Sequence, residues 1–214
     1  MGHVPQCKTA ELEILTFDRA LEAALKENES YDIAKWLYVP NEYTEYRYLL
    51  GTRGKNPLIC IGINPSTARP DALDNTLKSV ERIALFNGFD SFIMLNVYPQ
   101  RATNPDDMES CFNQTLHSEN LKAFEYALSL CKKSAPPSVW IASGNIIEKR
   151  LYLADCLADL KQIADRHGAK WFSCGKISVK GHPHHPLYLK KDSALDEFDI
   201  NRYTVALTEV KSIA

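Results

Sequence analysis

The sequence alternates short, unbroken apolar runs with longer segments whose apolar residues recur every three or four positions. The apolar runs lie at 58–63, 92–95, 139–142 and 169–174. Unbroken runs of this length are typical of strands that are covered on both faces in a parallel sheet. Because helices join such strands, the alternation predicts βαβ units, and hence a mostly parallel sheet with helices on both faces.

The segments between the apolar runs predict the helices. Apolar spacing together with Gly or Pro stop signals indicates helices around 73–84, from about 118 to 131, around 153–164 and over 203–213. An amphipathic helix is predicted over 10–28, and a strand and turn over 46–54. We therefore expect an N-terminal helical extension over 1–45. Residues 46–214 are expected to form one α/β domain, a three-layer α/β/α sandwich with a short, mostly parallel sheet.

The composition is that of a chain able to bury a core. Of the 214 residues 45% are hydrophobic, and 25 Lys and Arg against 27 Asp and Glu give a net charge of −2. This usage excludes global disorder. No apolar stretch approaches the ~18–20 residues of a membrane span. The near-neutral balance does not indicate a strongly basic nucleic-acid protein, although a local basic groove does not show in a whole-chain sum.

Cysteine usage and the N-terminus bear on the compartment. The six cysteines form no Cys-x-x-Cys pair, and several lie in apolar stretches. This pattern favours free thiols in a reducing cytoplasm over a disulfide framework. The first residues have neither a basic start nor an apolar run, so no secretory signal is visible. We expect a cytoplasmic protein with no membrane partner.

Polar clusters follow the predicted strands at the point where each strand ends. They are Asn64, Asn96, Ser143-Gly144-Asn145 and the segment 182–186. In open α/β sheets, ligands bind beyond the carboxyl ends of the strands. We therefore expect the four clusters to meet at one crevice.

The first cluster, 62–67, has a functional and a structural interpretation. Gly62 allows a ligand or backbone to approach closely, and Pro65 fixes the turn. Asn64 is suited to positioning a water, and the amides of Ser66 and Thr67 to facing an anion. The alternative is that Asn-Pro-Ser-Thr is ordinary turn and helix-capping chemistry.

Asn96 and the histidine segment also have both functional and structural interpretations. An amide offers donors and an acceptor, so Asn96 is suited to reading a heterocycle edge, or it ends its strand as an Asx-turn. In the segment 182–186, a histidine can stabilise a developing anion, a metal site is a second reading, and a Pro-rich surface loop is a third. We rank the anion role above the metal because no other ligand group has recognisable metal spacing.

Arginines near the strand ends are candidates for phosphate contacts, with solvated side chains as the alternative. They are Arg47, Arg53, Arg69 and Arg101. The chain has no phosphate-binding Gly-x-x-x-x-Gly-Lys-Ser/Thr, no dinucleotide-binding Gly-x-Gly-x-x-Gly after a strand, and no Gly-x-Ser-x-Gly nucleophile elbow. These absences disfavour the corresponding nucleotide hydrolases, dinucleotide enzymes and serine hydrolases.

The order of the clusters resembles the motif series of the uracil-DNA glycosylase superfamily. The corresponding stretches are 61–66, 94–96, 139–144 and 185–189. In that superfamily a water-activating Gly-x-(Asp/Asn)-Pro loop is followed by a strand ending in a base-reading Asn. An apolar strand ending in Gly and a His-Pro-Ser loop complete the series.

The chain is more closely similar to an uncharacterised bacterial and phage family, domain of unknown function sixteen-forty-three. The shared elements are Arg47-Tyr48, Asn-Pro-Ser-Thr-Ala at 64–68, Asp74-Asn75-Thr76, Leu95-Asn96, Arg-Ala-Thr-x-Pro at 101–105 and His-Pro-Leu-Tyr at 185–188. This resemblance brings no established activity.

The glycosylase resemblance implies roles for individual residues. Asn64 would orient the attacking water, Asn96 would read the base, and His185 would support the charge on the leaving base, with His182 as an alternative alignment. Leu189 would take the place of the residue that wedges into a duplex when a base is flipped. Gly62, Pro65, Ser66, Thr67, Arg101 and Gly144 complete the expected substrate-binding set.

The sequence departs from the superfamily at two positions. Ser66 stands where uracil-specific enzymes have a bulky Tyr, and Leu187 replaces the Ser that grips a DNA phosphate. The expected function is hydrolysis of an N-glycosidic bond in a nucleobase- or nucleotide-like ligand, free or in nucleic acid, with no cofactor and no metal. The alternatives are a non-catalytic base-binding module and a metal hydrolase using His182, His184 and His185.

Overall fold

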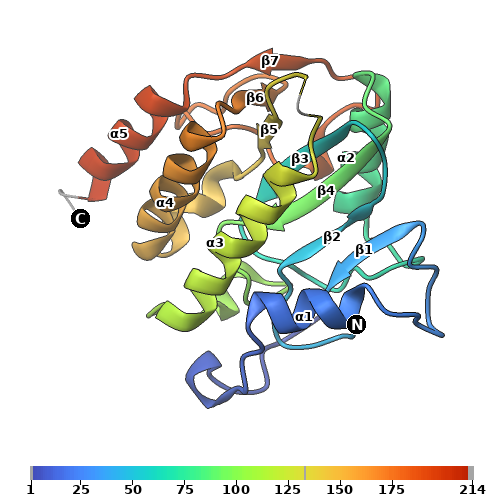
Figure 1. The fold of residues 1–214 in the computed structure, drawn as a ribbon. Coiled ribbons are helices and arrows are strands. Elements are labelled where there is room, and N and C mark those ends of the chain that lie inside the picture. The colour runs from blue at the N-terminus through green and yellow to red at the C-terminus, as the bar shows by residue number, and fades with distance from the viewer. Residues whose placement is uncertain (1, 133, 212–214) are drawn as a thin grey trace.

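A mixed sheet of seven strands organises the part of the chain that the structure describes, residues 2–132 and 134–211 of a computed structural model (Figure 1). The strands are β1 (Trp36–Val39), β2 (Leu49–Thr52), β3 (Pro57–Gly62), β4 (Ser91–Asn96), β5 (Ser138–Ile141), β6 (Lys170–Cys174) and β7 (Leu195–Glu197). Their spatial order is β1-β2-β4-β3-β5-β6-β7. The four central strands β4, β3, β5 and β6 run parallel, and the outer strands pair antiparallel.

Helices cover both faces of this sheet. They are α1 (Phe17–Ala24), α2 (Asn75–Phe86), α3 (Gln114–Ser129), α4 (Tyr152–Arg166) and α5 (Ile200–Lys211). The short 3₁₀ segments are η1 (Thr9–Glu11), η2 (Pro105–Asp107), η3 (Gly144–Lys149) and η4 (Pro186–Tyr188). Buried side chains of α2 belong to one core cluster, and those of the other four helices to a second. The chain is therefore an α/β protein with helical layers on two sides, as predicted.

Strand β3 shows why the apolar runs are unbroken. Leu58 and Cys60 pack with α2 in one core, whereas Ile59 and Ile61 pack in the other core. Successive side chains of a strand point to opposite faces. A strand that is buried on both faces must therefore be apolar at every position, and all six residues of β3 are buried.

Side-chain caps set where the helices begin. Asn113 accepts a hydrogen bond from the Leu116 amide, so α3 starts at Gln114 and not near 118. Thr16 accepts one from the Arg19 amide, and α1 therefore starts at Phe17, well inside the predicted helix 10–28. Such caps satisfy amides that have no partner within the helix.

The sheet itself differs from the prediction. The sequence predicts a short, mostly parallel sheet, but the structure has seven strands in three parallel and three antiparallel pairs. The difference comes from β2, which pairs antiparallel with β4, and from the edge strands β1 and β7, which lie outside the four apolar runs. Strand β7 has no apolar run because two of its three residues are charged and exposed. Strand β1 comes from the segment 1–45 and pairs with β2.

The last helix, α5, ends at Lys211. Residues 212 and 213, the end of the helix predicted over 203–213, lie outside the described residues, as does residue 214. None of the helices in the described ranges has the length and apolar character needed to cross a membrane.

The close approach of β2 to β4 leads to a stability prediction. A Cβ added to Gly51 would lie 2.1 Å from the Phe92 carbonyl oxygen and 2.8 Å from the Ile93 Cα. Both atoms belong to backbone, so the strands must separate to accept Gly51→Ala. We expect a loss of about 1–3 kcal/mol in the free energy of unfolding, measured by urea denaturation. Leu85→Ala, on the exposed side of α2, is the control and should change it by less than about 0.5 kcal/mol.

Candidate functional site

A cavity of about 740 Å³ lies at the carboxyl ends of the parallel strands. It is lined by residues that follow β3, β4, β5 and β6, and by the start of α2. They include Gly62, Asn64, Pro65, Ser66, Thr67, Asp74, Asn75, Thr76, Asn96, Gly144, Asn145, His184, His185, Leu187 and Tyr188. The four strand-end clusters of the sequence thus meet at one cavity. Its volume is within the range of about 300–1,000 Å³ typical of small-molecule sites.

The side-chain amide of Asn96 is the most unusual group of the cavity. Asn96 is 1% exposed, and neither its Nδ2 nor its Oδ1 has a hydrogen-bond partner among the described residues. Most buried polar side-chain atoms in proteins are hydrogen-bonded, and leaving one unpaired costs about 1–3 kcal/mol. An amide left unpaired where a cavity begins is therefore available to a ligand.

Gly62 makes room for this amide. Gly62 and Asn96 are partners at the ends of the parallel strands β3 and β4. A Cβ on residue 62 would lie 2.9 Å from the Asn96 Oδ1 and 2.6 Å from the Met94 Cε. The glycine therefore permits a close approach, as the sequence predicts, and the group that approaches is the Asn96 side chain.

The Asn64 side chain is held in one orientation by two carbonyl oxygens. Its Nδ2 donates to the Ala102 oxygen at 2.6 Å and to the Pro65 oxygen at 3.3 Å. Because carbonyl oxygens only accept hydrogen bonds, the amide must turn its nitrogen toward them. The Oδ1 accepts no hydrogen bond from the described residues, so it remains an acceptor for a ligand or water in the cavity that Asn64 lines.

His185 lines the cavity as a neutral imidazole. Burial lowers the pKa of its ring below the ordinary 6.5, and the charge of Asp74 acts in the opposite direction. The Leu187 amide donates to Nδ1 at 3.4 Å, which leaves the proton of the neutral ring on Nε2. A neutral ring in this tautomer is a hydrogen-bond donor.

Gly144 brings the histidine loop to the end of β5. Its amide donates to the Pro183 oxygen at 2.8 Å, and its φ of +57° is in the left-handed region that glycine adopts readily. A Cβ at residue 144 would lie 3.4 Å from the Cβ of His185. Gly144 therefore contributes to the cavity by positioning His185.

The structure places His182, the alternative to His185, outside the cavity lining. His182 is 4% exposed, its Nδ1 lies 2.9 Å from the Tyr203 hydroxyl, and its Nε2 lies 2.9 Å from Glu148 Oε1. With both ring nitrogens engaged, the side chain anchors the loop. Among the described residues no group of three His, Cys, Asp or Glu side chains is arranged to hold a metal ion. The metal-hydrolase alternative, which needs His182, His184 and His185 together, therefore lacks its ligand set.

Leu189 and Arg101 also lie away from the cavity lining. Leu189 packs against the α2-side core and next to Gly175, so it is not placed as a wedge. Leu187 and Tyr188, which are 42% and 78% exposed, line the cavity instead. Sequence alignment with the wedge position misses them because a 3₁₀ turn, η4, rotates the chain between residues 186 and 188.

Arg101 is a buried support for the loop after β3. Its Nη1 donates to the oxygens of Ser66 and Ala68, and its Nη2 donates to the Tyr38 hydroxyl at 3.1 Å. Its guanidinium also lies 4.2 Å from the ring centre of Tyr43. These contacts make Arg101 a support for the loop, although its Nε has no partner among the described residues. The substrate-binding role predicted for Arg101 stays a prediction.

Two charged residues of the lining have no specific role in the sequence analysis. Arg47, a phosphate candidate among four arginines, is 1% exposed and lines the cavity. Asp74 caps α2 through a hydrogen bond from the Leu77 amide and faces the same cavity. The sequence signal that could have identified Asp74 is its position as a helix cap, three residues before Leu77, the first buried residue of α2.

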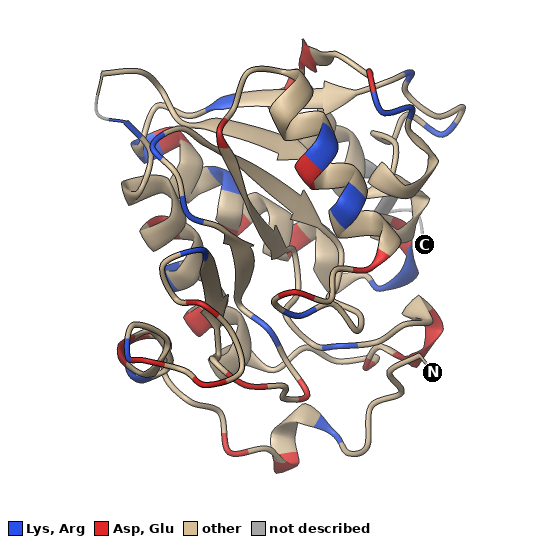
Figure 2. Cartoon of the chain, turned by 90° about the vertical axis from the view of Figure 1, so that its right-hand side faces the viewer, with Lys and Arg blue, Asp and Glu red and all other residues tan. Residues whose placement is uncertain are grey.

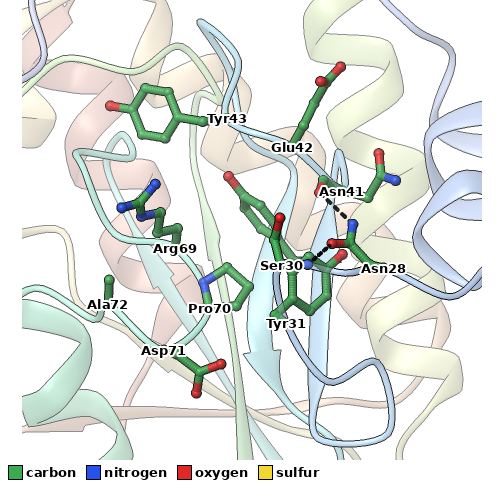
Figure 3. A pocket seen from close by; sticks show the side chains of 11 residues that line it. Asn28, Ser30, Tyr31, Asn41, Glu42, Tyr43, Arg69, Pro70, Asp71 and Ala72 are labelled. Carbon is green, nitrogen blue, oxygen red and sulfur yellow. Dashed lines mark hydrogen bonds between the residues drawn. The ribbon is translucent and has the colours of Figure 1, made fainter.

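A second hollow, of about 820 Å³, lies beside the loop 68–72 and contains none of the predicted site residues (Figure 3). Its lining includes Asn28 and Asp71. Asn28 bonds to the Asn41 oxygen and the Ser30 amide, as Figure 3 shows in part. Asp71 accepts from the Lys35 and Trp36 side chains. The Tyr31 hydroxyl also lines this hollow and has no partner among the described residues. The cavity at the strand ends is the stronger candidate site because the strand-end clusters and the unpaired Asn96 amide meet there.

Comparison with known proteins adds one finding. The family described as "Protein of unknown function (DUF1643)" matches residues 47–187. The chain belongs to this family. No curated protein and no solved structure matches the chain. The DUF1643 match extends from Arg47 to Leu187 and so takes in the whole cavity lining except Tyr188.

Replacement of the unpaired amide should not destabilise this DUF1643 protein. For Asn96→Leu we expect the free energy of unfolding to stay the same or rise by about 1 kcal/mol, because a buried unpaired amide is removed. Asn120→Leu is the matched control, since the Asn120 Nδ2 donates to the Asn96 backbone oxygen at 2.9 Å. Loss of this hydrogen bond should lower the free energy of unfolding by about 1–3 kcal/mol. Urea denaturation of both variants tests this, and equal losses would contradict a ligand-directed amide.

The state of His185 can be measured directly. NMR of the ring nitrogens, assigned with His185→Asn, should show the Nε2-protonated neutral form at pH 7 and titration below pH 6.5. Because the folded pKa is below the unfolded value, stability should fall as pH decreases from about 6.5 toward the folded pKa. His185→Asn should weaken that fall. Titration at or above 6.5, or a proton on Nδ1 at pH 7, would contradict the assignment.

Proposed function

We propose that the cavity binds a nucleobase-like ring and that the protein hydrolyses N-glycosidic bonds in the manner of the uracil-DNA glycosylase superfamily. The observation that carries the proposal is the buried, unpaired amide of Asn96 at the cavity. An amide matches the donor–acceptor edge of a pyrimidine or purine in a way that a single donor or acceptor does not.

Asn64 provides the position for the attacking water. Its Nδ2 is held by the Ala102 oxygen, so its Oδ1 is the group left to accept a hydrogen bond from water. A carboxamide is too weak a base to take a proton in full. Asn64 therefore orients the water and leaves the driving force to the positive charge that develops on the sugar.

His185 supports the leaving base. When the N-glycosidic bond breaks, its electron pair stays on the base, and negative charge spreads to the carbonyl oxygens of the ring. A neutral imidazole with its proton on Nε2 donates a hydrogen bond to such an oxygen. Preorganised donors aimed at developing charge are among the largest contributions to catalysis. The water oxygen then bonds to the sugar carbon, and its proton passes to the released base through solvent.

The order of the motifs supports the same reaction. The Gly-Ile-Asn-Pro loop at 62–65, Asn96 and His185-Pro186 follow the glycosylase series in sequence, and all of these residues except Pro186 line one cavity. A second candidate is a binding module that holds the ring without cleaving the bond. The same pairing capacity of Asn96 favours it, and the two differ only in whether base is released.

Base release from a defined panel tests the proposal. The panel contains oligonucleotides with uracil, hypoxanthine or mismatches, and free nucleosides and nucleotides, with released base measured by chromatography. We expect Asn64→Ala to lower the rate by about 10²-fold, because the acceptor for the water is lost while the binding groups remain. Asn96→Leu should weaken binding and release together.

Asn201→Ala is the control for Asn64→Ala, because it makes the same substitution at an exposed position of α5. It should leave ligand binding and base release unchanged. Binding without release by the parent protein, with binding weakened by Asn96→Leu, would replace the enzyme by the binding module. Binding of bases that is indifferent to Asn96→Leu would contradict both.

A further inference from the structure

Arg47 is a buried cation whose hydrogen-bonding capacity is largely unused. It is 1% exposed, and its Nη1 donates to the Ala68 oxygen at 3.1 Å. Its Nε has no partner among the described residues, and within them no carboxylate forms an ion pair with it. Burial and the neighbouring charge of Arg101 lower the pKa of Arg47 to about 9, so it remains positive at pH 7. A buried charge without a paired charge is costly, which makes a bound anion the natural counterpart.

The start of α2 faces the same cavity with free amides. Asp74 accepts from the Leu77 amide through its side chain and from the Lys78 amide through its backbone oxygen. The amides of Asn75 and Thr76 have no acceptor among the described residues, and both residues line the cavity with Arg47. Helix α2 has twelve residues, so its N-terminus carries an appreciable partial positive charge.

The one carboxylate among the described lining residues is Asp74. Its charge opposes an anion, and it also acts on Arg47 from beyond ion-pair distance. Because its Oδ1 is engaged by the Leu77 amide, the carboxylate serves as the helix cap. The donors that we assign to an anion are the guanidinium of Arg47 and the amides of Asn75 and Thr76.

We propose that the ligand of the cavity is a nucleoside monophosphate, whose phosphate lies between Arg47 and the first turn of α2 while its base reaches Asn96. The base half of this inference rests on the function proposed above, and the anion half rests on Arg47 and α2. A phosphate offers acceptor oxygens in several directions, which suits a planar guanidinium and helix amides approaching from different elements.

The burial of Arg47 favours a terminal phosphate over a phosphodiester in a polymer. A phosphodiester needs two chain exits, whereas a terminal phosphate needs one path to a side chain that is 1% exposed. Segments with Lys and Arg are interspersed with segments with Asp and Glu in the view of Figure 2, and the net charge of −2 does not favour a long polyanion.

A proline substitution removes one donor while preserving the fold. Asn75 is the first residue of α2, a position that accepts proline because its amide has no partner within the helix. The preceding residue, Asp74, has φ −73° and ψ 174°, an extended conformation compatible with a following proline. Asn75→Pro therefore deletes the amide hydrogen, and Asn75→Ala keeps it as the matched control.

Calorimetric titration with matched ligands tests the proposal. The probes are nucleosides, their 5′-monophosphates, orthophosphate and a single-stranded oligonucleotide. For the base that binds, we expect the monophosphate to bind at least about tenfold more tightly than the nucleoside. Asn75→Pro should reduce that preference by about tenfold, whereas Asn75→Ala should preserve it. Arg47→Lys keeps the positive charge but replaces the planar guanidinium by an ammonium group. This variant should also reduce the preference for the monophosphate, provided that urea unfolding shows an intact fold.

Other outcomes separate the two proposals. Equal affinities for nucleoside and monophosphate, or equal effects of Asn75→Pro and Asn75→Ala, would overturn the phosphate site. A preference for the oligonucleotide that the monophosphate does not compete away would overturn the monophosphate in favour of a nucleic acid. If orthophosphate binds and Asn75→Pro weakens it while no nucleoside binds, the anion site stands and the base pocket fails.

Discussion

The parallel pairing of β3 with β4 is the constraint on which the candidate site depends. Their register runs from Pro57 with Ser91 to Gly62 with Asn96, so the two strands end at the same level. A shift of one residue would turn Asn96 to the other face of the sheet. Because residue 62 has no side chain, the Asn96 amide fits beside the strand end, in a position where any Cβ would lie 2.9 Å from its Oδ1. Every proposal about a bound ring depends on this pair.

The loop after β3 is held by side chains from distant parts of the chain. Arg47 and Arg101 both donate to the Ala68 oxygen, and Arg101 also donates to the Ser66 oxygen. Two like charges brought to one carbonyl repel each other, which is reflected in the effect of Arg101 on the pKa of Arg47. The loop is therefore positioned by groups that would gain from a nearby anion. Of the two, only Arg47 lines the cavity, so the anion binding that we propose belongs to Arg47, and Arg101 supports the loop.

The sequence predicts the central layers well because burial on both faces leaves a strong pattern. Strands β3 to β6 and helices α2 and α4 lie close to their predicted ranges, and the strand-end rule brings Asn64, Asn96, Gly144 and His185 to one cavity. The edge strand β7 is not predicted because two of its three residues are charged and exposed, whereas β1 is a buried apolar run of four residues that lies within the segment expected to be helical. The choice between His182 and His185 also lies beyond pattern reading, since both precede a proline, and only the contacts with Tyr203 and Glu148 tell them apart.

Unused hydrogen-bonding capacity unites the groups of the cavity. The Asn96 amide, the Asn64 Oδ1, the Arg47 Nε and the first amides of α2 come from four separate segments, and none of them has a partner among the described residues. The energetic cost falls on the buried members, the Asn96 amide and the Arg47 Nε, because water can pair with the amide of the exposed Asn75 and with the half-buried Asn64. Each buried unpaired group costs about 1–3 kcal/mol, and mutation toward apolar residues would relieve that loss. The presence of both groups at one cavity supports our proposal of a polar, anionic ligand that supplies the missing partners.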